Sequence, residues 1–546
     1  MYILSAGLAL FACACILSIL LAAQAHRRIR AASLGAAPVG TPYLQYLEDK
    51  RQLNAYGYAQ LLRRGRSGFG SFSMSFATMS VFGCAALYFG PVYELAGPWA
   101  YGLGLPLVAL FAVIVGAAVA ELASSMPTAG ACYHWSRVAG GRSWGRGALL
   151  LRTLSDISML ALLNGAAAML IDMAAARWIG YAAGGWSVLL WTVGLLVGQA
   201  AAAAFGRPGG DRLLGGVSWL QVGLVVAVVA GLLLLFEPGL QPAAYLFSAG
   251  AHGSGDYGWL QLGAAIVLLQ RFFVGADNAA AGSEESSGPS VQVPWGIYLS
   301  TVYGFILAYV LCVFVTLSIT GPVAGAGGGG LFLALISDIW GSLSPYASTV
   351  LYVSVIVCLW TSGLGVLTAS SRQWFAYHRD GRNSWSRWLQ HIDSRRQTPQ
   401  RLILLLAAVA GGAAAALWLW QPWAAAGQSR LVYLSAASTI GFNLSLLIPL
   451  ALRYRLTAPA PERGAPCWQL GSLSRPLRLT AILWLLTTAL GAAMLLSPTA
   501  SGHLALTLLA LLLLWSLTRL LSGRWRVAAP PGRAELLAQE RGYRQL

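Results

Sequence analysis

The sequence predicts an all-α integral membrane protein, an inverted-repeat transporter with twelve core transmembrane helices and one extra N-terminal helix. Three observations predict this fold. The 546 residues are 57% hydrophobic and only 10% charged, with a mean hydropathy of +0.65, which excludes soluble globular classes. Apolar stretches long enough to cross a bilayer follow one another along the chain. Two of them, five apart in order, are interrupted near their middle, which is typical of inverted-repeat transporters.

The chain carries a large excess of positive charge. Its 35 Lys and Arg residues against 18 Asp and Glu residues give a net charge of +17. In a soluble protein this excess would suggest binding to nucleic acid. Between membrane segments, basic residues instead mark cytoplasmic loops, so we expect the lipid bilayer and no nucleic acid as a partner.

The first apolar stretch is expected to be a transmembrane anchor, residues 1–25, with its N-terminus outside. A cleaved signal peptide is the alternative, because Ala23, Gln24 and Ala25 resemble a cleavage site. No positive charge precedes the apolar run, however, and basic residues follow it directly, which favours the anchor. Residues 26–66 are polar and basic, and we expect them at the cytoplasmic surface.

Twelve further apolar segments form the predicted core. They span residues 67–93, 99–126, 147–175, 186–205, 213–236, 259–281, 295–320, 346–377, 402–420, 431–452, 479–496 and 503–521. Arginine-rich loops alternate with arginine-free loops, which supports this count and a cytoplasmic C-terminus. We therefore divide the core into a first repeat (67–236, core helices 1–5), a second repeat (237–452, core helices 6–10) and a final pair with its preceding cytoplasmic loop (453–521), before a cytoplasmic tail (522–546).

The sixth core segment places charge in the middle of an apolar run. Arg271, Asp277 and the flexible Gly275 all lie within residues 270–285. Ionisable groups at membrane depth cost at least about 2.5 kcal/mol each. Non-helical backbone survives there only where it packs in protein or lines a cavity. We therefore expect a broken helix that forms part of a binding site.

The first core segment is unusual in a similar way, because residues 71–80 are rich in hydroxyl and small side chains. Serine and threonine can bond back to the carbonyls of their own unbroken helix. The occurrence of two such segments favours two broken helices, whose half-helix ends expose N–H and carbonyl groups at the membrane midplane.

No motif predicts an enzyme. Residues 141–145 match the GxSxG pattern of a nucleophile, but they lie in a short basic loop rather than between a strand and a helix. The single lysine, Lys50, has no glycine-rich loop before it, which excludes a phosphate-binding loop. We expect neither a metal nor another cofactor, apart from a coupling ion.

Four stretches resemble one transporter family. Residues 121–135 are similar to the AE-x-x-x-x-PT-[AS]-GG-x-YHW signature of the amino acid-polyamine-organocation superfamily, closest to its amino acid/choline transporter branch. Residues 53–64 resemble that branch's LGY-x-x-x-LRR, residues 277–285 its D-A-A-A-H-M-x-EE, and residues 370–381 its ASSRQ-x-x-AFARDG. The likeness covers about residues 53–521. Ala131, Cys132, Ala281 and Gly282 depart from the family pattern.

The resemblance implies a five-plus-five inverted-repeat fold that works by alternating access in the plasma (inner) membrane. It implies an amino acid or related amine as substrate, such as 4-aminobutyrate, choline or a polyamine. The matching positions of the substrate site lie in the first and sixth core helices: Ala77, Thr78, Met79, Ser80, Phe273, Val274, Gly275, Ala276 and Asp277.

Two further charged residues are candidates for the substrate site. Asp156 lies near mid-membrane and could pair with a substrate amine or with Arg152, one turn earlier on the same helix. Arg271 could bind a substrate carboxylate or neutralise Asp156 or Asp277, and we favour the internal pair. Three glutamates near the cytoplasmic ends, Glu121, Glu284 and Glu285, are expected to form gate contacts with loop arginines.

The coupling ion is open at this stage. Sodium-coupled relatives use hydroxyl groups on the first and eighth helices, and Thr361 and Ser362 are available in the eighth. Proton coupling through Asp277, Asp156 or Glu121, or plain exchange, are the alternatives.

We therefore predict a secondary transporter, not an enzyme, for an amino acid or related amine. The alternative is a transporter-like sensor or regulatory subunit that binds such a ligand without moving it. The extra N-terminal helix could then dock a membrane partner.

Overall fold

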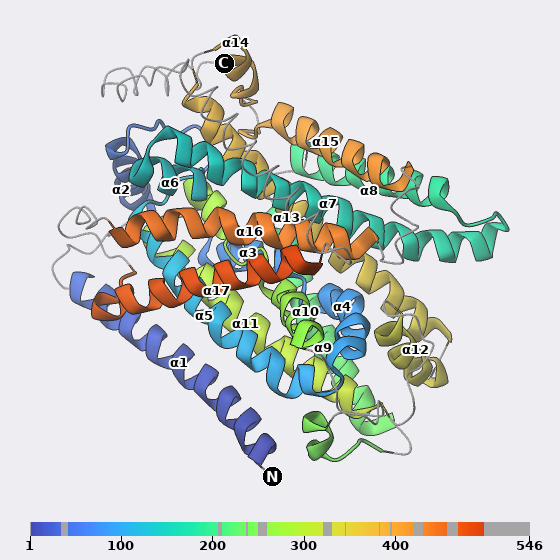
Figure 1. Cartoon of the computed structure of the whole chain (residues 1–546). Coiled ribbons are helices and arrows are strands. Elements are labelled where there is room, and N and C mark those ends of the chain that lie inside the picture. Colours follow the sequence, from blue (N-terminus) through green and yellow to red (C-terminus); the bar gives the residue numbers. More distant parts are fainter. Residues whose placement is uncertain are drawn as a thin grey trace.

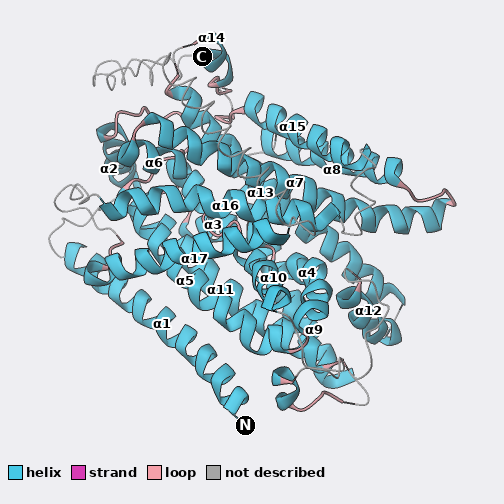
Figure 2. Cartoon of the chain, in the orientation of Figure 1, coloured by secondary structure: helices cyan, strands magenta, loops and turns pink. Residues whose placement is uncertain are grey.

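The structure is a computed structural model that describes residues 2–495, apart from 34–41, 206–209, 236–238, 249–258, 320–329, 344, 382, 394–395, 420–429 and 456–467. Its described elements are helices, with no strand among them (Figure 2). Among the residues that the structure describes, eleven stretches are long and apolar enough to cross a membrane. The predicted all-helical membrane fold is confirmed, while the predicted last segment, 503–521, and the tail, 522–546, lie outside the described residues.

Helix α1 (Tyr2–Ser33) is one continuous helix that runs eight residues beyond the predicted end of the anchor. Arginines near its C-terminal end favour this extension, because cations stabilise the carbonyl end of a helix. The helix lies along one side of the bundle against α5 (Figure 1). The Phe11 ring stacks on Tyr309 with centroids 4.8 Å apart, and the Tyr298 hydroxyl donates to the Ser18 carbonyl.

The first half of the core opens with a broken helix, as predicted. Helix α3 (Gly68–Met79) ends at Ser80, which has a left-handed φ of +49°, and α4 (Val81–Ala96) begins at the next residue. A positive φ is rare for a residue with a Cβ, so this break is a fixed feature of the fold. The rest of this half consists of η1 (Ala100–Gly104), α5 (Leu105–Ser125), α6 (Cys132–Gly140), α7 (Arg142–Ile179), α8 (Gly185–Phe205) and α9 (Gly210–Leu235).

The second half also opens with a broken helix. Helix α10 (Trp259–Leu269) passes into the 3-10 turn η3 (Gln270–Phe273), a non-helical turn at 274–277, and the 3-10 turn η4 (Asn278–Glu285). The predicted break in the sixth core segment is therefore confirmed. This half continues with α11 (Pro289–Leu317), α12 (Leu331–Leu343), α13 (Pro345–Arg379), α14 (Ser384–Leu389), α15 (Gln400–Leu419) and α16 (Arg430–Arg455).

Short helices cover the two ends of the bundle. Helices α2 (Pro42–Ala55), α6 and α14 lie toward one end, and α12 lies toward the other (Figure 1). We call the first the basic end, because the arginine-rich loops lie there. Helix α12 forms within a segment predicted as an outer loop, and η2 (Ala243–Phe247) precedes α10. The turn η6 (Gly471–Leu473) leads into α17 (Ser474–Leu495), the last described helix.

The breaks lie inside the bundle because longer helices surround them. Helix α7 packs along α16 and α13, and α11 packs along α5 and α3. The described residues 270–285 are all buried. Unpaired backbone groups in this segment are therefore shielded from lipid, which is the condition under which a membrane helix can be broken.

Candidate functional site

The segments beside the two breaks meet at Thr78, in the last turn of α3, and Gly275. Gly275 has a φ of +96°, and a Cβ at this position would lie 2.8 Å from Thr78 Cγ2. Glycine is thus required both for the turn and for the close approach. Nearby, the Ser75 hydroxyl accepts a 3.0 Å hydrogen bond from the Ala279 N–H. The last turns of α3 therefore contact the non-helical turn and η4 of the sixth core helix.

A buried ionic cluster joins α7 to the second break. Arg152 Nε donates to Asp156 Oδ1 at 2.9 Å, and Arg152 Nη1 donates to Asp277 Oδ2 at 2.5 Å. The third nitrogen, Nη2, donates to the Asn278 side chain. Arg152, Asp156, Asp277 and Asn278 are all at most 4% exposed. We call these four residues the central cluster.

By formal charge, the central cluster has one negative charge in excess, since two carboxylates share one guanidinium. Asp156 Oδ2 and Asp277 Oδ1 accept no hydrogen bond from the described residues. The Ser370 hydroxyl of α13 lies near the Asp156 carboxyl. Buried charges of this kind are normally paired. The cluster therefore presents open acceptor oxygens to a cationic group.

The contacts of Arg271 differ from the internal ion pair that we expected for it. Its Nη1 donates to the Ser438 hydroxyl at 2.9 Å, and its guanidinium lies 5.8 Å from the centre of the Tyr88 ring. No ion pair to Asp156 or Asp277 is found for it in the described part of the chain. The predicted internal pair was wrong, because Arg152 of α7 forms the ion pairs with both Asp156 and Asp277. Arg271 Nε is buried and donates to no described residue.

The other predicted positions of the first core helix have separate environments. Ala77 packs in a small apolar cluster with Met74 and Leu214. Met79 points toward Gly304 of α11. Ser80 Oγ donates to the Cys358 carbonyl of α13 at 3.2 Å, which holds the strained break in place.

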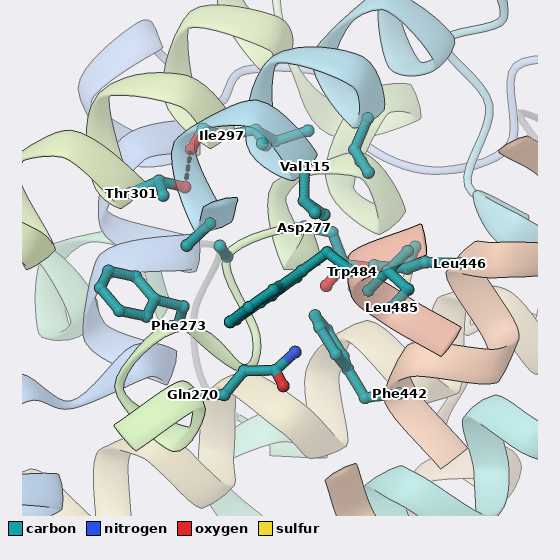
Figure 3. A pocket seen from close by; sticks show the side chains of 14 residues that line it. Val115, Gln270, Phe273, Asp277, Ile297, Thr301, Phe442, Leu446, Trp484 and Leu485 are labelled. Atoms are coloured by element: carbon teal, nitrogen blue, oxygen red, sulfur yellow. Dashed lines mark hydrogen bonds between the residues drawn. The ribbon is translucent and has the colours of Figure 1, made fainter. Parts of the chain in front are cut away.

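The predicted site residues before Asp277 lie partly in the hydrophobic core and partly in the wall of a cavity. Val274 packs in the main hydrophobic core. Phe273 and Ala276 line a cavity that also contains Asp277 (Figure 3). We call it the lateral cavity, because its walls come from α5, α11, α16 and α17 as well as the broken helix.

Two glutamates at the basic end pair with arginines. Glu284 accepts two hydrogen bonds from Arg379, at 2.8 and 3.0 Å, and one from the Ala129 N–H. Glu285 pairs with Arg66 at 2.8 Å and with Arg372 at 3.0 Å. These pairs tie the segment before α3, the end of η4 and α13 together. We call Glu284, Glu285, Arg66, Arg372 and Arg379 the gate cluster.

A second charged group lies beside the gate cluster, between α6 and Asp380 at the end of α13. Asp380 accepts a hydrogen bond from Tyr133 at 2.8 Å and pairs with Arg137. Burial alone would raise the pKa of the Asp380 carboxyl, but His134, Arg137 and Arg379 hold that pKa at about 2. Burial lowers the pKa of His134 below its usual value. Asp380 is therefore ionised and His134 neutral near pH 7.

Glu121 contacts a different part of the chain from the gate cluster. Its carboxylate accepts from the Ser474 hydroxyl at 2.5 Å and from Arg478 at 3.3 Å. It therefore joins α5 to the start of α17 at the side of the bundle.

The two predicted hydroxyl groups of the eighth core helix lie beside the first break. Ser362 Oγ donates to the Thr78 carbonyl at 2.5 Å. Thr361 Oγ1 donates to the Val357 and Cys358 carbonyls of its own helix. A set of hydroxyl and carbonyl oxygens thus gathers where α13 crosses the first core helix.

Several contacts were missed by reasoning from the sequence. Arg152 was considered only as a neighbour of Asp156, and Asn278, although adjacent to Asp277, was not considered. Ser438 and Phe442 lie on α16, where nothing in the sequence distinguishes them from packing residues. The Arg152 guanidinium lies 5.4 Å from the centre of the Phe442 ring.

Comparisons with known proteins show the family of this chain. Residues 67–518 match a family model described as amino acid permease. An uncharacterized amino-acid permease of Schizosaccharomyces pombe is 26% identical over 455 residues, covering 80% of this chain and 76% of the relative. The GABA-specific permease of Saccharomyces cerevisiae is 26% identical over 387 residues, covering 66% of this chain and 64% of that protein.

A solved structure shares the fold. The crystal structure of MhsT in complex with L-phenylalanine superimposes with a TM-score of 0.52 at 16% sequence identity, covering 79% of this chain and 99% of MhsT. Together with the family match, this similarity supports a transporter rather than an enzyme. The chain thus belongs to the amino acid permease family, and it is a multi-pass secondary transporter for an amino acid or a related amine.

Proposed function

We propose that the central cluster binds the ammonium group of the substrate. The observation that carries this proposal is the unbalanced charge of the cluster, in which Asp156 and Asp277 share only Arg152. An ammonium group at Asp277 Oδ1 would supply the missing positive charge and a hydrogen-bond donor in a buried site. Charge-assisted hydrogen bonds are roughly twice as strong as neutral ones.

Arg271 is the proposed partner of the carboxylate when the substrate is an amino acid. Its guanidinium is 1% exposed, and its Nε is open. Ser438 bonds to Arg271 and also lies 3.4 Å from the Ser155 hydroxyl, next to Asp156. The positive and negative groups thus border one region, which suits a zwitterion. A substrate without a carboxylate would need the aspartates alone.

Alternating access would then proceed through the gate cluster. We infer a plasma-membrane location with the basic end facing the cytoplasm, because basic loops are retained on that side. The start of α1 lies away from α2 and α6 (Figure 1), which supports an N-terminus outside. Ile16, Ile19 and Leu20 of α1 are more than half exposed, and this face would contact lipid or a membrane partner.

We propose sodium as the coupling ion, held where α13 crosses the first break. The hydroxyl groups of Thr361 and Ser362 and the Thr78 carbonyl provide hard oxygen ligands of the type that alkali cations prefer. Proton coupling through Asp156 or Asp277 is the competing mechanism. A sodium gradient and a pH gradient distinguish the two directly.

The test is uptake into proteoliposomes of a labelled panel: neutral, basic and acidic amino acids, 4-aminobutyrate, choline and putrescine. Each is measured with an imposed sodium or pH gradient. Asp277→Asn is expected to abolish concentrative uptake of the transported class. Asp172→Asn is the matched control, because Asp172 is equally buried on α7 but hydrogen-bonds Tyr181, away from the central cluster.

Arg271→Gln separates the two substrate classes. It should abolish uptake of an amino acid and leave uptake of an amine such as putrescine within about threefold. Saturable ligand binding without flux under either gradient would contradict the transport mechanism and favour a sensor. Equal loss in Asp277→Asn and Asp172→Asn would show that the aspartate effect is structural.

A further inference from the structure

Helix α14 lies at the basic end, where three membrane spans leave the apolar core (Figure 1). The span of α13 ends at Arg379, the span of α15 begins at Gln400, and the span of α8 ends at Phe205. Gln400 Nε2 donates to the Ala204 carbonyl at 3.3 Å, which ties the start of α15 to the end of α8. Polar headgroups border the hydrocarbon core of a bilayer. The described residues between 383 and 401 are therefore placed at the depth of the lipid headgroups.

Helix α14 has a buried face that fixes its orientation. The Asn383 side chain caps the helix by accepting from the Ser386 N–H at 2.9 Å. The Ser386 hydroxyl lies 3.1 Å from His378 Nδ1 of α13, and Leu389 packs in one apolar cluster with Phe375 of the same helix. Because this face is held against α13, the opposite face of α14 is presented outward in a defined position.

The outward face of α14 carries two tryptophans. Trp385 is 68% exposed and Trp388 is 50% exposed, and their ring centroids lie 5.9 Å apart with planes inclined by 86°. Tryptophan is enriched at membrane–water interfaces, because one end of its ring is apolar and the indole N–H is polar. The two rings therefore indicate that this face of α14 lies in the interface of the bilayer.

Arginines border the tryptophans. The Arg401 guanidinium lies 5.0 Å from the centre of the Trp388 ring, and its Nη1 donates to the Trp388 carbonyl at 2.8 Å. The Arg396 guanidinium lies 5.1 Å from the centre of the Phe205 ring, which is 54% exposed. Both arginines are half-buried. Aromatic contacts thus hold two cations at the ends of α8 and α15.

The charge of this region is not balanced by the protein. Residues 383–401 contain four arginines and one aspartate. That aspartate, Asp393, accepts a 3.4 Å hydrogen bond from Gln400. Within the described part of the chain, no carboxylate pairs with Arg396 or Arg401. A guanidinium can donate to two oxygens of one phosphate, so these side chains suit a phosphate group at the membrane surface.

We propose that α14 and the start of α15 form a binding site for an anionic phospholipid. Its phosphate binds Arg396 and Arg401, and its glycerol and upper acyl chains contact Trp385 and Trp388. Basic clusters directly beside a membrane span attract anionic lipids of the facing leaflet. A zwitterionic lipid binds less well, because its own cation neutralises the phosphate. The site is independent of the transport path and of the substrate proposed above.

The test is titration of phosphatidylglycerol into the purified full-length protein in detergent, with bound lipid counted by native mass spectrometry. Phosphatidylglycerol should bind saturably, and phosphatidylcholine about tenfold more weakly. Arg396→Gln/Arg401→Gln should weaken phosphatidylglycerol binding about tenfold. Arg396→Lys/Arg401→Lys should stay within about threefold of wild type, because it keeps both charges. Arg27→Gln/Arg212→Gln is the matched control, since it removes the same charge from exposed positions of α1 and α9, and it should bind like wild type.

Trp385→Ser tests the aromatic contact without changing the charge. Trp385 is largely exposed, so the fold should persist while phosphatidylglycerol binding weakens about threefold. Bound lipid should also raise the unfolding temperature of the wild type, and less so that of Arg396→Gln/Arg401→Gln, because a ligand of the folded state stabilises it.

Three results would overturn the proposal. The first is equal phosphatidylglycerol binding by wild type and Arg396→Gln/Arg401→Gln. The second is an equal loss in that variant and in Arg27→Gln/Arg212→Gln, because binding would then follow overall charge. The third is displacement of phosphatidylglycerol by an equal concentration of glycerol 3-phosphate, because a soluble phosphate ester would then be the ligand. Each of these leaves the transport proposal untouched, since no transport is measured.

Discussion

Arg152 and Asp277 form an ion pair between residues 125 positions apart, with Arg152 Nη1 2.5 Å from Asp277 Oδ2. The pair joins the long helix α7 to the break in the sixth core helix. Both side chains are buried, at 2% and 3% exposure. Because Arg152 also holds Asp156 and Asn278, a single guanidinium fixes the geometry of the whole central cluster.

Arg152→Gln should strongly destabilise the protein. Removing one partner of a buried ion pair costs about 3–5 kcal/mol, because the remaining charges are left uncompensated. We expect a clear fall in the thermal unfolding temperature in detergent. The double variant Arg152→Gln/Asp277→Asn should recover part of the loss, and a strictly additive double variant would contradict the pair.

Gly275→Ala should disturb the contact between the two breaks. The added Cβ would meet Thr78 Cγ2 at 2.8 Å, and alanine disfavours the φ of +96°. The left-handed conformation alone costs about 1–2 kcal/mol. Uptake and unfolding temperature should both fall. Gly263→Ala is the control, since no heavy atom lies within 4 Å of its added Cβ, and it should leave both measurements nearly unchanged.

Arg379→Gln should open the gate cluster. It leaves Glu284, which is 0% exposed, without its cation, so the closed state loses roughly 3–5 kcal/mol. A cysteine introduced at the buried Ser283 should then react at least tenfold faster with a membrane-impermeant maleimide added at the basic end. Arg387→Gln, at an exposed position of α14, is the control. Equal labelling of the two variants would argue against a gate.

Acidification should destabilise the folded protein through His134 on α6. Its pKa is lowered in the folded protein, so the unfolded chain binds more protons below about pH 6.5. Stability is therefore fully present above that pH and falls as pH drops toward the folded value. Asp380 acts in the same direction at lower pH, because its folded pKa of about 2 lies below the unfolded value near 3.9.

The measurement is the unfolding temperature between pH 7.5 and 5. Wild type should lose stability over this range, and His134→Gln should show a smaller loss. His391→Gln, which changes an exposed histidine, should follow the wild type. An unfolding temperature of the wild type that rises on acidification would mean that folding raises the pKa of a titrating group. It would contradict a buried neutral imidazole at His134.

Much of the fold followed from local properties of the sequence. Helix spans follow from hydrophobicity over about 20 residues, and the breaks follow from charge and hydroxyl groups placed inside two of those spans. The pairing of Glu284 and Glu285 with arginines was also predictable, because buried carboxylates near a basic surface need cations. The extension of α1 past residue 25 was missed, since polar residues can continue a helix beyond the membrane.

The contact partners of individual charged residues were harder to predict from the sequence. Asp156 lies one turn from Arg152, so this pair could be weighed from spacing alone. Arg271 was assigned to the aspartates because of its position in the same segment, yet it bonds Ser438, 167 positions away. Sequence distance does not reveal which faces of two helices meet.

The sequence by itself determined that this chain is a helical membrane transporter with two broken helices and buried charge at the second break. The physical reason is that hydrophobicity, backbone conformation and the cost of burying charge act locally. Only the tertiary structure decided that Arg152 neutralises Asp277, that Thr78 meets Gly275, and that Phe442 and Trp484 enclose a cavity. These contacts depend on how α7, α16 and α17 pack around the breaks, which no single segment encodes.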